Sequence, residues 1–220
     1  MLARLIILAV LMLSVACSGF NREKPPDITD DGLQRIISPD FELIYVRPNI
    51  NLFGYDSIYM ADLKVAFKRG WQASQNISDP NRVSDRDISR IKRILRAEFV
   101  KVFANELAAE TGYTIVTQPG QNTLILNPQI VDLYINSPQN SSGYQMTVLS
   151  ENVGSMTIKL ELSDASNNEA LLRISDRRQG REYGGFRPQE TVQNRTESDR
   201  LLRIWAKSLS KTLIESRSPG

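Results

Sequence analysis

Apolar residues recur at helical spacing through the middle of the chain, over residues 88–107. The members of this face are Ile88, Ile91, Leu95, Phe99 and Val102. They lie three or four positions apart, which gathers them on one side of a helix. Ser84 stands three residues before Asp87, the spacing of a capping box, and Gly112 follows the run, where a left-handed C-cap belongs. The pattern predicts a helix of about seven turns over residues 84–112.

A second apolar stripe of the same spacing occurs near the end of the chain. It consists of Leu201, Leu202, Trp205, Leu209 and Leu213. Thr196 and Asp199 repeat the capping interval, so we expect this helix to begin near Asn194 or Thr196. Because Trp205 lies on the stripe, we expect its ring in the core.

Strict alternation of apolar and polar residues predicts strands elsewhere. Over residues 152–162, Met156, Ile158, Leu160 and Leu162 alternate with Thr157, Lys159 and Glu161. The turn-forming run 164–168 predicts a hairpin to a partner strand over residues 170–176. Further strands are expected over residues 41–46, 55–67 with a bulge near Ala61, 113–116 and 123–136.

Three local signals refine this outline. Pro128 interrupts the predicted strand 123–136, so we expect a kink or an edge position there. Residues 32–37 suit a short helical turn, and residues 68–82, which contain Gly70 and Pro80, suit a loop. The order of elements predicts an α+β fold, with a single mainly antiparallel β-sheet packed by one long and one C-terminal helix. Residues 38–217 are expected to form one domain.

The first seventeen residues carry a targeting signal. Arg4 precedes an unbroken apolar run over residues 5–13, and small residues follow it up to Cys17. The run is too short to span a bilayer, so it predicts a secretory signal peptide. The junction of Ala16 and Cys17 resembles the lipobox of bacterial lipoproteins, although Ser14 stands where that family prefers leucine.

The resemblance implies a cleaved signal peptide over residues 1–16, lipidation of Cys17 and a flexible tether over residues 17–37. The alternative is an ordinary secreted protein in which Cys17 is a free thiol. Ser18 stands where aspartate would retain a lipoprotein in the inner membrane. The expected location is therefore the outer membrane, facing the periplasm, with the inner membrane as the alternative.

Composition narrows the function further. The chain has 27 basic and 25 acidic residues, a formal net charge of +2, so no nucleic-acid partner is expected. It contains no histidine, which is the commonest general base and metal ligand, and one cysteine. We expect no catalytic residues, no metal and no cofactor, and hence no enzyme. The alternative on this point is a glycosidase that uses two distant carboxylates.

Several motifs together resemble a known family. They are Ser38, Pro39 and Asp40, the strand entry at 55–58, the segment 112–116 after the long helix, the strand 124–131 and the hairpin arm 160–164. With the lipobox, they make the chain similar to the bacterial lipoprotein family called domain of unknown function 3313, over residues 38–213. The resemblance implies no assigned catalytic residue.

Two polar segments are candidate binding sites. Arg173, Arg177 and Arg178 could bind an anion such as a phosphate, lipid A or a glycan carboxylate, since guanidinium groups bind such anions bidentately. The alternative is a solvated strand end whose charge is offset by Asp176, Glu182 and Glu190.

The adjoining loop joins aromatic residues to flexible glycines. Its candidate partner-docking residues are Arg181, Tyr183, Phe186 and Arg187. The alternative is a connection whose aromatic side chains cover the sheet edge. Trp71 and Phe53 present the same choice between core and docking.

These features favour a non-enzymatic, lipid-anchored protein that binds an envelope protein or assists its assembly, and that contacts the membrane through Cys17. The alternative function is a carrier or sensor of a lipid or glycan, with its groove between the sheet and the long helix.

Overall fold

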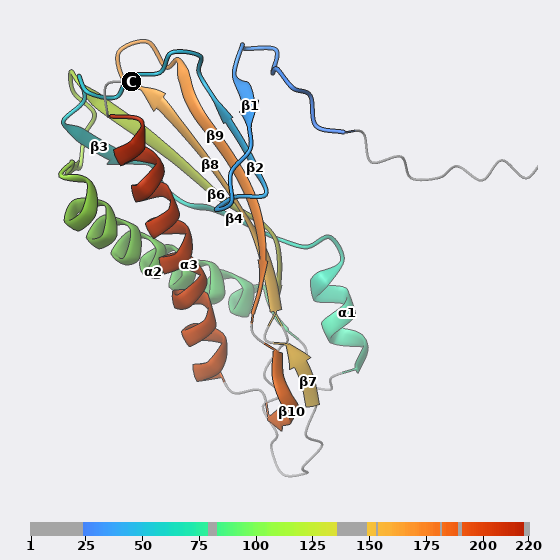
Figure 1. Ribbon diagram of the computed structural model, residues 1–220. Helices are drawn as coiled ribbons and strands as arrows, with labels where there is room; N and C mark the ends of the chain where they lie inside the picture. The colour runs from blue at the N-terminus through green and yellow to red at the C-terminus, as the bar shows by residue number, and fades with distance from the viewer. Residues whose placement is uncertain are drawn as a thin grey trace, which may run out of the picture.

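The computed structural model describes residues 24–78, 83–135, 149–152, 154–180, 182–188 and 191–217, with the backbone alone at 78 and over 149–152, 182–188 and 191–196. One eight-stranded sheet forms a layer, and two long helices form a second layer on one of its faces (Figure 1). The expected α+β class is thereby confirmed.

The sheet runs in the order β1-β2-β9-β8-β6-β3-β5, and β4 also pairs with β6. In chain order its strands are β1 Gln34–Ile36, β2 Leu43–Val46, β3 Ser57–Met60, β4 Lys64–Phe67, β5 Thr114–Val116, β6 Thr123–Ile135, β8 Gly154–Asp164 and β9 Ala170–Gln179. A separate two-stranded sheet pairs β7 Leu149–Asn152 with β10 Glu182–Pro188.

The sheet is mixed, which corrects the expectation of a mainly antiparallel one. Along the row β1-β2-β9-β8-β6, each strand is antiparallel to its neighbour. In contrast, β3 and β4 run parallel to β6, and β5 runs parallel to β3. Between β4 and β5 the chain passes through the helix α2 Asp85–Thr111. A helix of this length returns the chain to the end of the sheet from which it started, so the strands on either side of it run in the same direction.

Helix α2 has the predicted caps. The hydroxyl of Ser84 accepts a hydrogen bond from the backbone N–H of Asp87, and the carboxylate of Asp87 accepts one from the backbone N–H of Ser84. At the other end, Gly112 adopts φ 71°, a left-handed conformation that is easiest for glycine. Local sequence therefore determines both ends of the helix.

The C-terminal helix, α3 Thr191–Glu215, begins earlier than the capping interval suggests. Asp199 consequently lies inside the helix, where its carboxylate pairs with Arg203 one turn on, at 2.8 Å. A spacing of three residues occurs as often within a helix as at its start, so it is a weak signal unless a breaker precedes it.

Three further expectations were wrong in detail. Residues 34–36 form the edge strand β1 rather than a helical turn, because they pair with β2. Residues 71–78 form the helix α1 Trp71–Ser78 within the expected loop. The expected single strand over 55–67 is two strands, β3 and β4, which pair in succession with β6.

Pro128 lies within the sheet, opposite the break between β3 and β4. The carbonyl of Leu126 accepts a hydrogen bond from the N–H of Ala61, so the backbone groups of Leu126 point toward β3. Because backbone groups two residues apart point to the same side of a strand, the nitrogen of Pro128 points the same way. It faces residues 61–63, between β3 and β4, which form no strand. The missing donor therefore costs no ladder hydrogen bond, and no edge position is needed.

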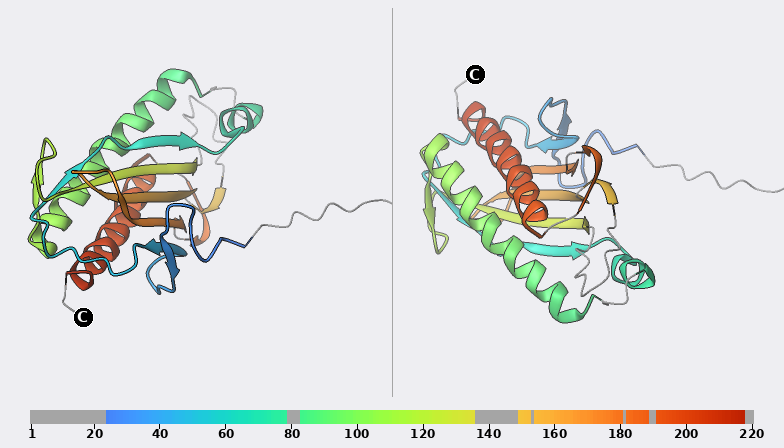
Figure 2. Two further views of the ribbon diagram at one scale, coloured as in Figure 1. Left: turned by 90° about the horizontal axis from the view of Figure 1, so that it is seen from above. Right: turned by 90° about the horizontal axis from the view of Figure 1, so that it is seen from below.

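The core lies between the sheet and the two helices. Phe99, Phe103 and Trp205 from the helices are fully buried against strand residues such as Ile158 and Leu126. Figure 2 shows the helices behind the sheet from above and in front of it from below. The sheet therefore has one covered face and one open face.

Candidate binding surface

The open face carries the residues that alternate with the core positions of β4, β6, β8 and β9. Register places Lys64, Gln129, Lys159 and Ser175 in one row across these strands. Thr157 and Arg177 form part of the next row, and Asn127, Glu161 and Arg173 part of the row on the other side. Since the helices cover the opposite face, this broad polar surface is presented to the surroundings.

Four cations form what we call the basic band of the open face: Lys64, Lys68, Lys159 and Arg177, all exposed. Within the part of the chain that the structure describes, none of them forms an ion pair. Lys68 lies 5.8 Å from the centre of the Tyr134 ring, and Arg177 donates to the hydroxyl of Ser155 at 3.1 Å. Two carboxylates border the band, Asp132 at the bulge of β6 and Glu161, which is paired with Arg173, so the four cations still outnumber them.

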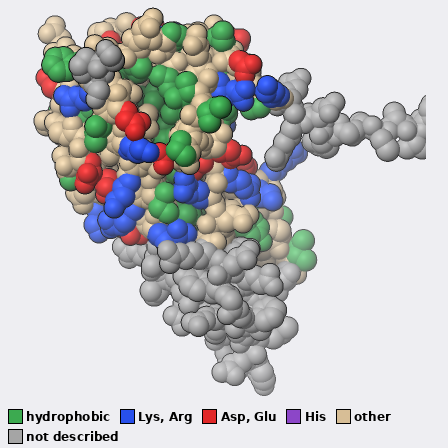
Figure 3. Space-filling model, viewed as in Figure 1, with side chains coloured by type: hydrophobic (Ala, Val, Ile, Leu, Met, Phe, Trp, Pro, Cys, Tyr) green, Lys and Arg blue, Asp and Glu red, His purple; other side chains and the backbone are tan. Residues whose placement is uncertain are grey.

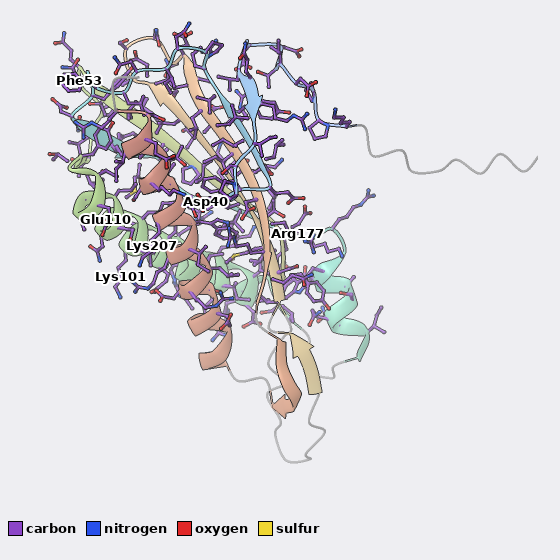
Figure 4. The ribbon with its side chains drawn as sticks, in the orientation of Figure 1. Asp40, Phe53, Lys101, Glu110, Arg177 and Lys207 are labelled. Carbon is purple, nitrogen blue, oxygen red and sulfur yellow. The ribbon has the colours of Figure 1, made fainter. Side chains whose placement is uncertain are left out.

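The three arginines predicted to form an anion site do not lie together. Arg173 and Arg177 lie on the open face, whereas Arg178 lies on the covered side, because consecutive strand residues point to opposite faces. Figure 4 shows Arg177 on the side of the sheet away from the helices. Two of the three are already bound to carboxylates, as described next.

Arg173 fixes the start of the domain to the open face. Its guanidinium contacts Glu161 at 2.8 Å and Asp31 at 2.9 Å. The hydrogen bond from Arg173, assisted by one from Thr29, lowers the pKa of Asp31 to about 2. Arg47 donates to the backbone carbonyl of Asp31 at 2.7 Å.

The hydroxyl of Tyr45 makes a second attachment, donating to the carbonyl of Pro26 at 2.9 Å. Residues 26–31, which we call the entry segment, therefore lie against the open face. The predicted tether over residues 17–37 is in this part bonded to the domain.

Arg178 belongs to a buried network around Asp176, which is 5% exposed. The carboxylate of Asp176 accepts from Arg178 Nε at 2.7 Å, from Trp205 Nε1 at 2.7 Å and from the backbone N–H of Glu42 at 2.8 Å. These bonds join β9, α3 and the chain before β2. Because Arg178 already donates to Asp176 and to the carbonyl of Asp40, its guanidinium cannot bind an external anion bidentately through these same donors.

Asp40, part of the family motif, ties the same elements together. Its carboxylate pairs with Lys211 of α3 at 2.8 Å, and its carbonyl accepts from Arg178 at 2.9 Å. Figure 4 shows Asp40 beside α3. The motif at residues 38–40 therefore has a structural explanation.

Trp71 and Phe53, for which the sequence left a choice between core and docking, differ in burial: Trp71 lies in the interior and Phe53 on the surface. Trp71 is 2% exposed, stacks on Phe67 at 4.2 Å between ring centres, and donates from Nε1 to the carbonyl of Ile135 at 2.8 Å. Phe53 is 73% exposed. The side chains of Arg181, Tyr183, Phe186 and Arg187, and the whole of Cys17, lie outside the described residues.

A small hollow lies where the ends of β6 and β8 meet the start of α3. Its lining includes Ile135, Gly154, Met156 and Leu201. Its volume of about 20 Å³ has room for roughly one water molecule, whereas pockets for organic ligands usually exceed about 300 Å³. The hollow gives no support to a carrier of lipids or glycans.

The face shown in Figure 3, on which the helices lie, has basic and acidic side chains interspersed. Ion pairs such as Arg200 with Glu197 and Arg203 with Asp199 account for part of this mixture. The two faces of the domain thus differ, since the cations of the basic band form no ion pairs with described residues, whereas several cations of the helix face do.

Sequence reasoning missed the basic band because its members are far apart in the chain. Alternation gave Lys159 an outward position, but only the register of β4, β6 and β8 brings it into the same row as Lys64.

Among the described residues, no group of histidine, cysteine, aspartate or glutamate side chains is suited to hold a metal ion. None of the described helices is long and apolar enough to span a bilayer.

Comparison with solved structures finds several similar chains. One is a PelC dodecamer from Paraburkholderia phytofirmans, with 11% identity and a TM-score of 0.38 over 80% of this chain and 96% of that one. Another is protein XCC0632 from Xanthomonas campestris, with 8% identity and a TM-score of 0.39 over 78% and 90%. A third is a candidate lipoprotein from Caulobacter crescentus CB15, with 14% identity and a TM-score of 0.34 over 77% and 98%.

Comparison of sequences gives a more definite result. No curated protein matches the chain. Residues 28–209 match the family described as protein of unknown function DUF3313, in agreement with the motifs at residues 38–40 and 112–116. The match covers most of the chain, including the sheet, α2 and most of α3, and the chain therefore belongs to the DUF3313 family.

Proposed function

We propose that this protein is a lipid-anchored, non-enzymatic binding protein of the bacterial cell envelope, attached through Cys17 and assisting an envelope protein assembly. The leader supports the anchor, since its short apolar run is followed, after residues 14–16, by the only cysteine in the chain. Ser18, which follows the cysteine, favours the outer membrane. A triacylated cysteine would hold the protein stably, because one acyl chain alone gives only marginal binding.

One observation carries the proposal: the chain enters the domain along a broad open face rather than beside an enclosed cleft. The entry segment is bonded to Arg173 and Tyr45 on that face. The surface next to the anchor is therefore accessible over several strands, as suits recognition of another surface. The buried carboxylate of Asp176 accepts hydrogen bonds from three protein donors, which supports a structural rather than a catalytic role for it.

The anchor is tested by metabolic labelling with palmitate in the wild type and in a Cys17→Ala variant. We expect label and membrane fractionation for the wild type, and neither for the variant. Separation of inner from outer membranes on a density gradient then tests the location. Absence of label from the wild type, with the protein in the soluble fraction, would refute the anchor.

The accessory role is tested by cross-linking in intact cells, followed by purification of the wild type and the Cys17→Ala variant. We expect an envelope protein to be cross-linked reproducibly to the wild type and more weakly to the variant, which is not held at the membrane. A wild-type protein that is lipidated but cross-links to no envelope protein would contradict the role while leaving the anchor intact.

A further inference from the structure

The entry segment determines which side of the domain lies nearest the membrane, if Cys17 is the anchor as proposed above. Six residues, 18–23, lie between Cys17 and Lys24, the first described residue, so Cys17 and Lys24 can be at most about 25 Å apart. Beyond Lys24 the chain is fixed to the open face by Tyr45 and Arg173. The open face is thus the side from which the short connection to the bilayer departs.

The helix face lies farther from this connection. The helices pack on the opposite side of the sheet (Figure 2), and a helix layer adds roughly 10 Å to the sheet. Lys101 of α2 and Lys207 of α3 are exposed on that side, away from Arg177 (Figure 4). A domain held by so short a connection therefore approaches the bilayer most readily with its open face.

Charge on the open face matches such an approach. Lys159 lies opposite Ser175 in the register, and Arg177 is two residues farther along the same strand, so the two cations are diagonal neighbours about 7–8 Å apart. Lys64 lies two strands away in the same row as Lys159. The spacing spreads positive charge over several strands, which suits many small anionic groups on a flat surface rather than one enclosed anion.

We infer that the basic band docks on the anionic headgroups of the bilayer that holds the anchor. Lys159 and Arg177 form its centre, with Lys64 and Lys68 at its rim. Interaction with headgroup phosphates would hold the sheet close to the membrane surface and turn the helices toward the periplasm. Each basic side chain near an anionic surface favours docking by roughly fivefold, an effect that weakens with ionic strength.

The test measures the orientation of the lipidated protein in vesicles. Because Cys17 is acylated in the proposal and is the only cysteine, one introduced cysteine provides a unique labelling site. Gln129→Cys places a fluorophore on the open face, and Asn105→Cys places one on the exposed side of α2; both positions are polar, uncharged and exposed. Energy transfer to acceptor-labelled headgroups reports the distance of each site from the membrane.

In vesicles of phosphatidylethanolamine with one-third phosphatidylglycerol, we expect clearly greater transfer from position 129 than from position 105. The difference should fall in phosphatidylcholine vesicles and in 0.5 M salt to the smaller value that the short connection alone produces. The double variant Lys159→Glu with Arg177→Glu should reduce the docked population at least tenfold. The matched variant Lys101→Glu with Lys207→Glu, on the helix face, should leave it unchanged.

Equal transfer from the two sites in anionic vesicles would overturn the inference, and would leave the open face free for a protein or polysaccharide. A difference that stays undiminished in high salt or in the Lys159→Glu, Arg177→Glu variant would also overturn it, because the tether alone would then set the orientation. Circular dichroism confirms that each variant is folded. Failure of the anchor is seen separately, since unacylated protein lacks the added mass on Cys17 and does not float with vesicles.

Discussion

At the scale of single residues, Asp176 joins parts of the chain that are distant in sequence. Its carboxylate is buried and accepts hydrogen bonds from Arg178, Trp205 and the backbone of Glu42. Three donors on one carboxylate satisfy the charge that burial would otherwise penalise. Loss of the carboxylate would leave the indole N–H of Trp205 without a partner in the interior, and would leave the partly buried guanidinium of Arg178 with only the carbonyl of Asp40.

Asp176→Ala should therefore lower the free energy of unfolding by about 3–5 kcal/mol, the usual cost of removing one partner from a buried ion pair. Urea denaturation followed by circular dichroism measures the change. Glu110→Ala, at an exposed position of α2 (Figure 4), is the control and should change the value by less than about 0.5 kcal/mol. Equal effects of the two substitutions would contradict the role given to Asp176.

Asp31 predicts a response to acid. The hydrogen bond from Arg173 lowers its pKa to about 2. Because the folded-state pKa lies below the ordinary value near 3.8, the stabilising contact is complete above about pH 4 and is lost as the pH falls toward 2. We expect the contact between Asp31 and Arg173 to be lost in that range, while the bonds from Tyr45 to Pro26 and from Arg47 to the backbone carbonyl of Asp31 still hold the entry segment.

Carbon-13 NMR of the Asp31 carboxyl group checks this prediction. Arg173→Gln should raise the pKa of Asp31 toward its ordinary value, with the bond from Thr29 still holding it somewhat low. Arg177→Gln removes a nearby arginine that makes no contact with Asp31 and should leave the pKa unchanged. An Asp31 pKa unaffected by Arg173→Gln would show that the pair does not form in solution.

At the scale of elements, α2 is bounded by local chemistry at both ends. Gly112 has φ 71°, and a Cβ added there would meet no atom within 4 Å. The cost of a side chain is therefore backbone strain alone, without steric clash. This separates the conformational contribution of the C-cap from packing.

Gly112→Ala should lower the free energy of unfolding by about 1–2 kcal/mol. Gly54→Ala is a matched control, because its added Cβ also meets no atom within 4 Å and its φ lies outside the left-handed region. Its effect should stay within about 1 kcal/mol of zero. Thermal unfolding of the two variants side by side makes the comparison, and a Gly112→Ala protein as stable as the wild type would contradict the cap.

How far the sequence predicts an element depends on where its determinants lie. Helix α2 was predicted with both caps, because Ser84, Asp87 and Gly112 act on their own neighbours. The strand β8 was predicted with its faces, because alternation is also local. The edge strand β1 was not, since three residues become a strand only by pairing with β2.

The candidate site was harder to predict than the fold. Cations of the open face come together through the register of strands that are distant in the chain, and no local pattern specifies that register. The arginines at 173, 177 and 178 appeared as a cluster in sequence, yet the pleat separates Arg178 from the others. Adjacency along a strand is thus a poor guide to adjacency in space, because successive side chains point in opposite directions.

At the scale of the whole molecule, one hydrophobic core joins the sheet to α2 and α3. Trp205 lies fully buried in this core, whereas Trp71 is the first residue of α1 and stacks on Phe67 at the end of β4. Phe67 packs in turn against the main core. The two tryptophans therefore report on different regions of one continuous structure.

We expect those regions to unfold together. In Trp71→Phe, fluorescence reports on Trp205, and in Trp205→Phe it reports on Trp71. Within each variant, the urea midpoint from fluorescence should agree with that from far-UV circular dichroism, as a two-state transition requires. A fluorescence change of Trp71 at clearly lower urea than the loss of secondary structure would show that the α1 region unfolds separately.

The last helix also sets the time at which the fold can be completed. Leu202, Trp205 and Leu209 of α3 are fully buried, and the carbonyl of Ser216 accepts a hydrogen bond from the N–H of Leu52. Until these residues emerge, one side of α2 and much of the sheet have no apolar partner. If the leader directs secretion as proposed, the chain crosses the membrane as an extended polypeptide, and a core that closes only when α3 arrives keeps the preceding chain unfolded until that helix has crossed.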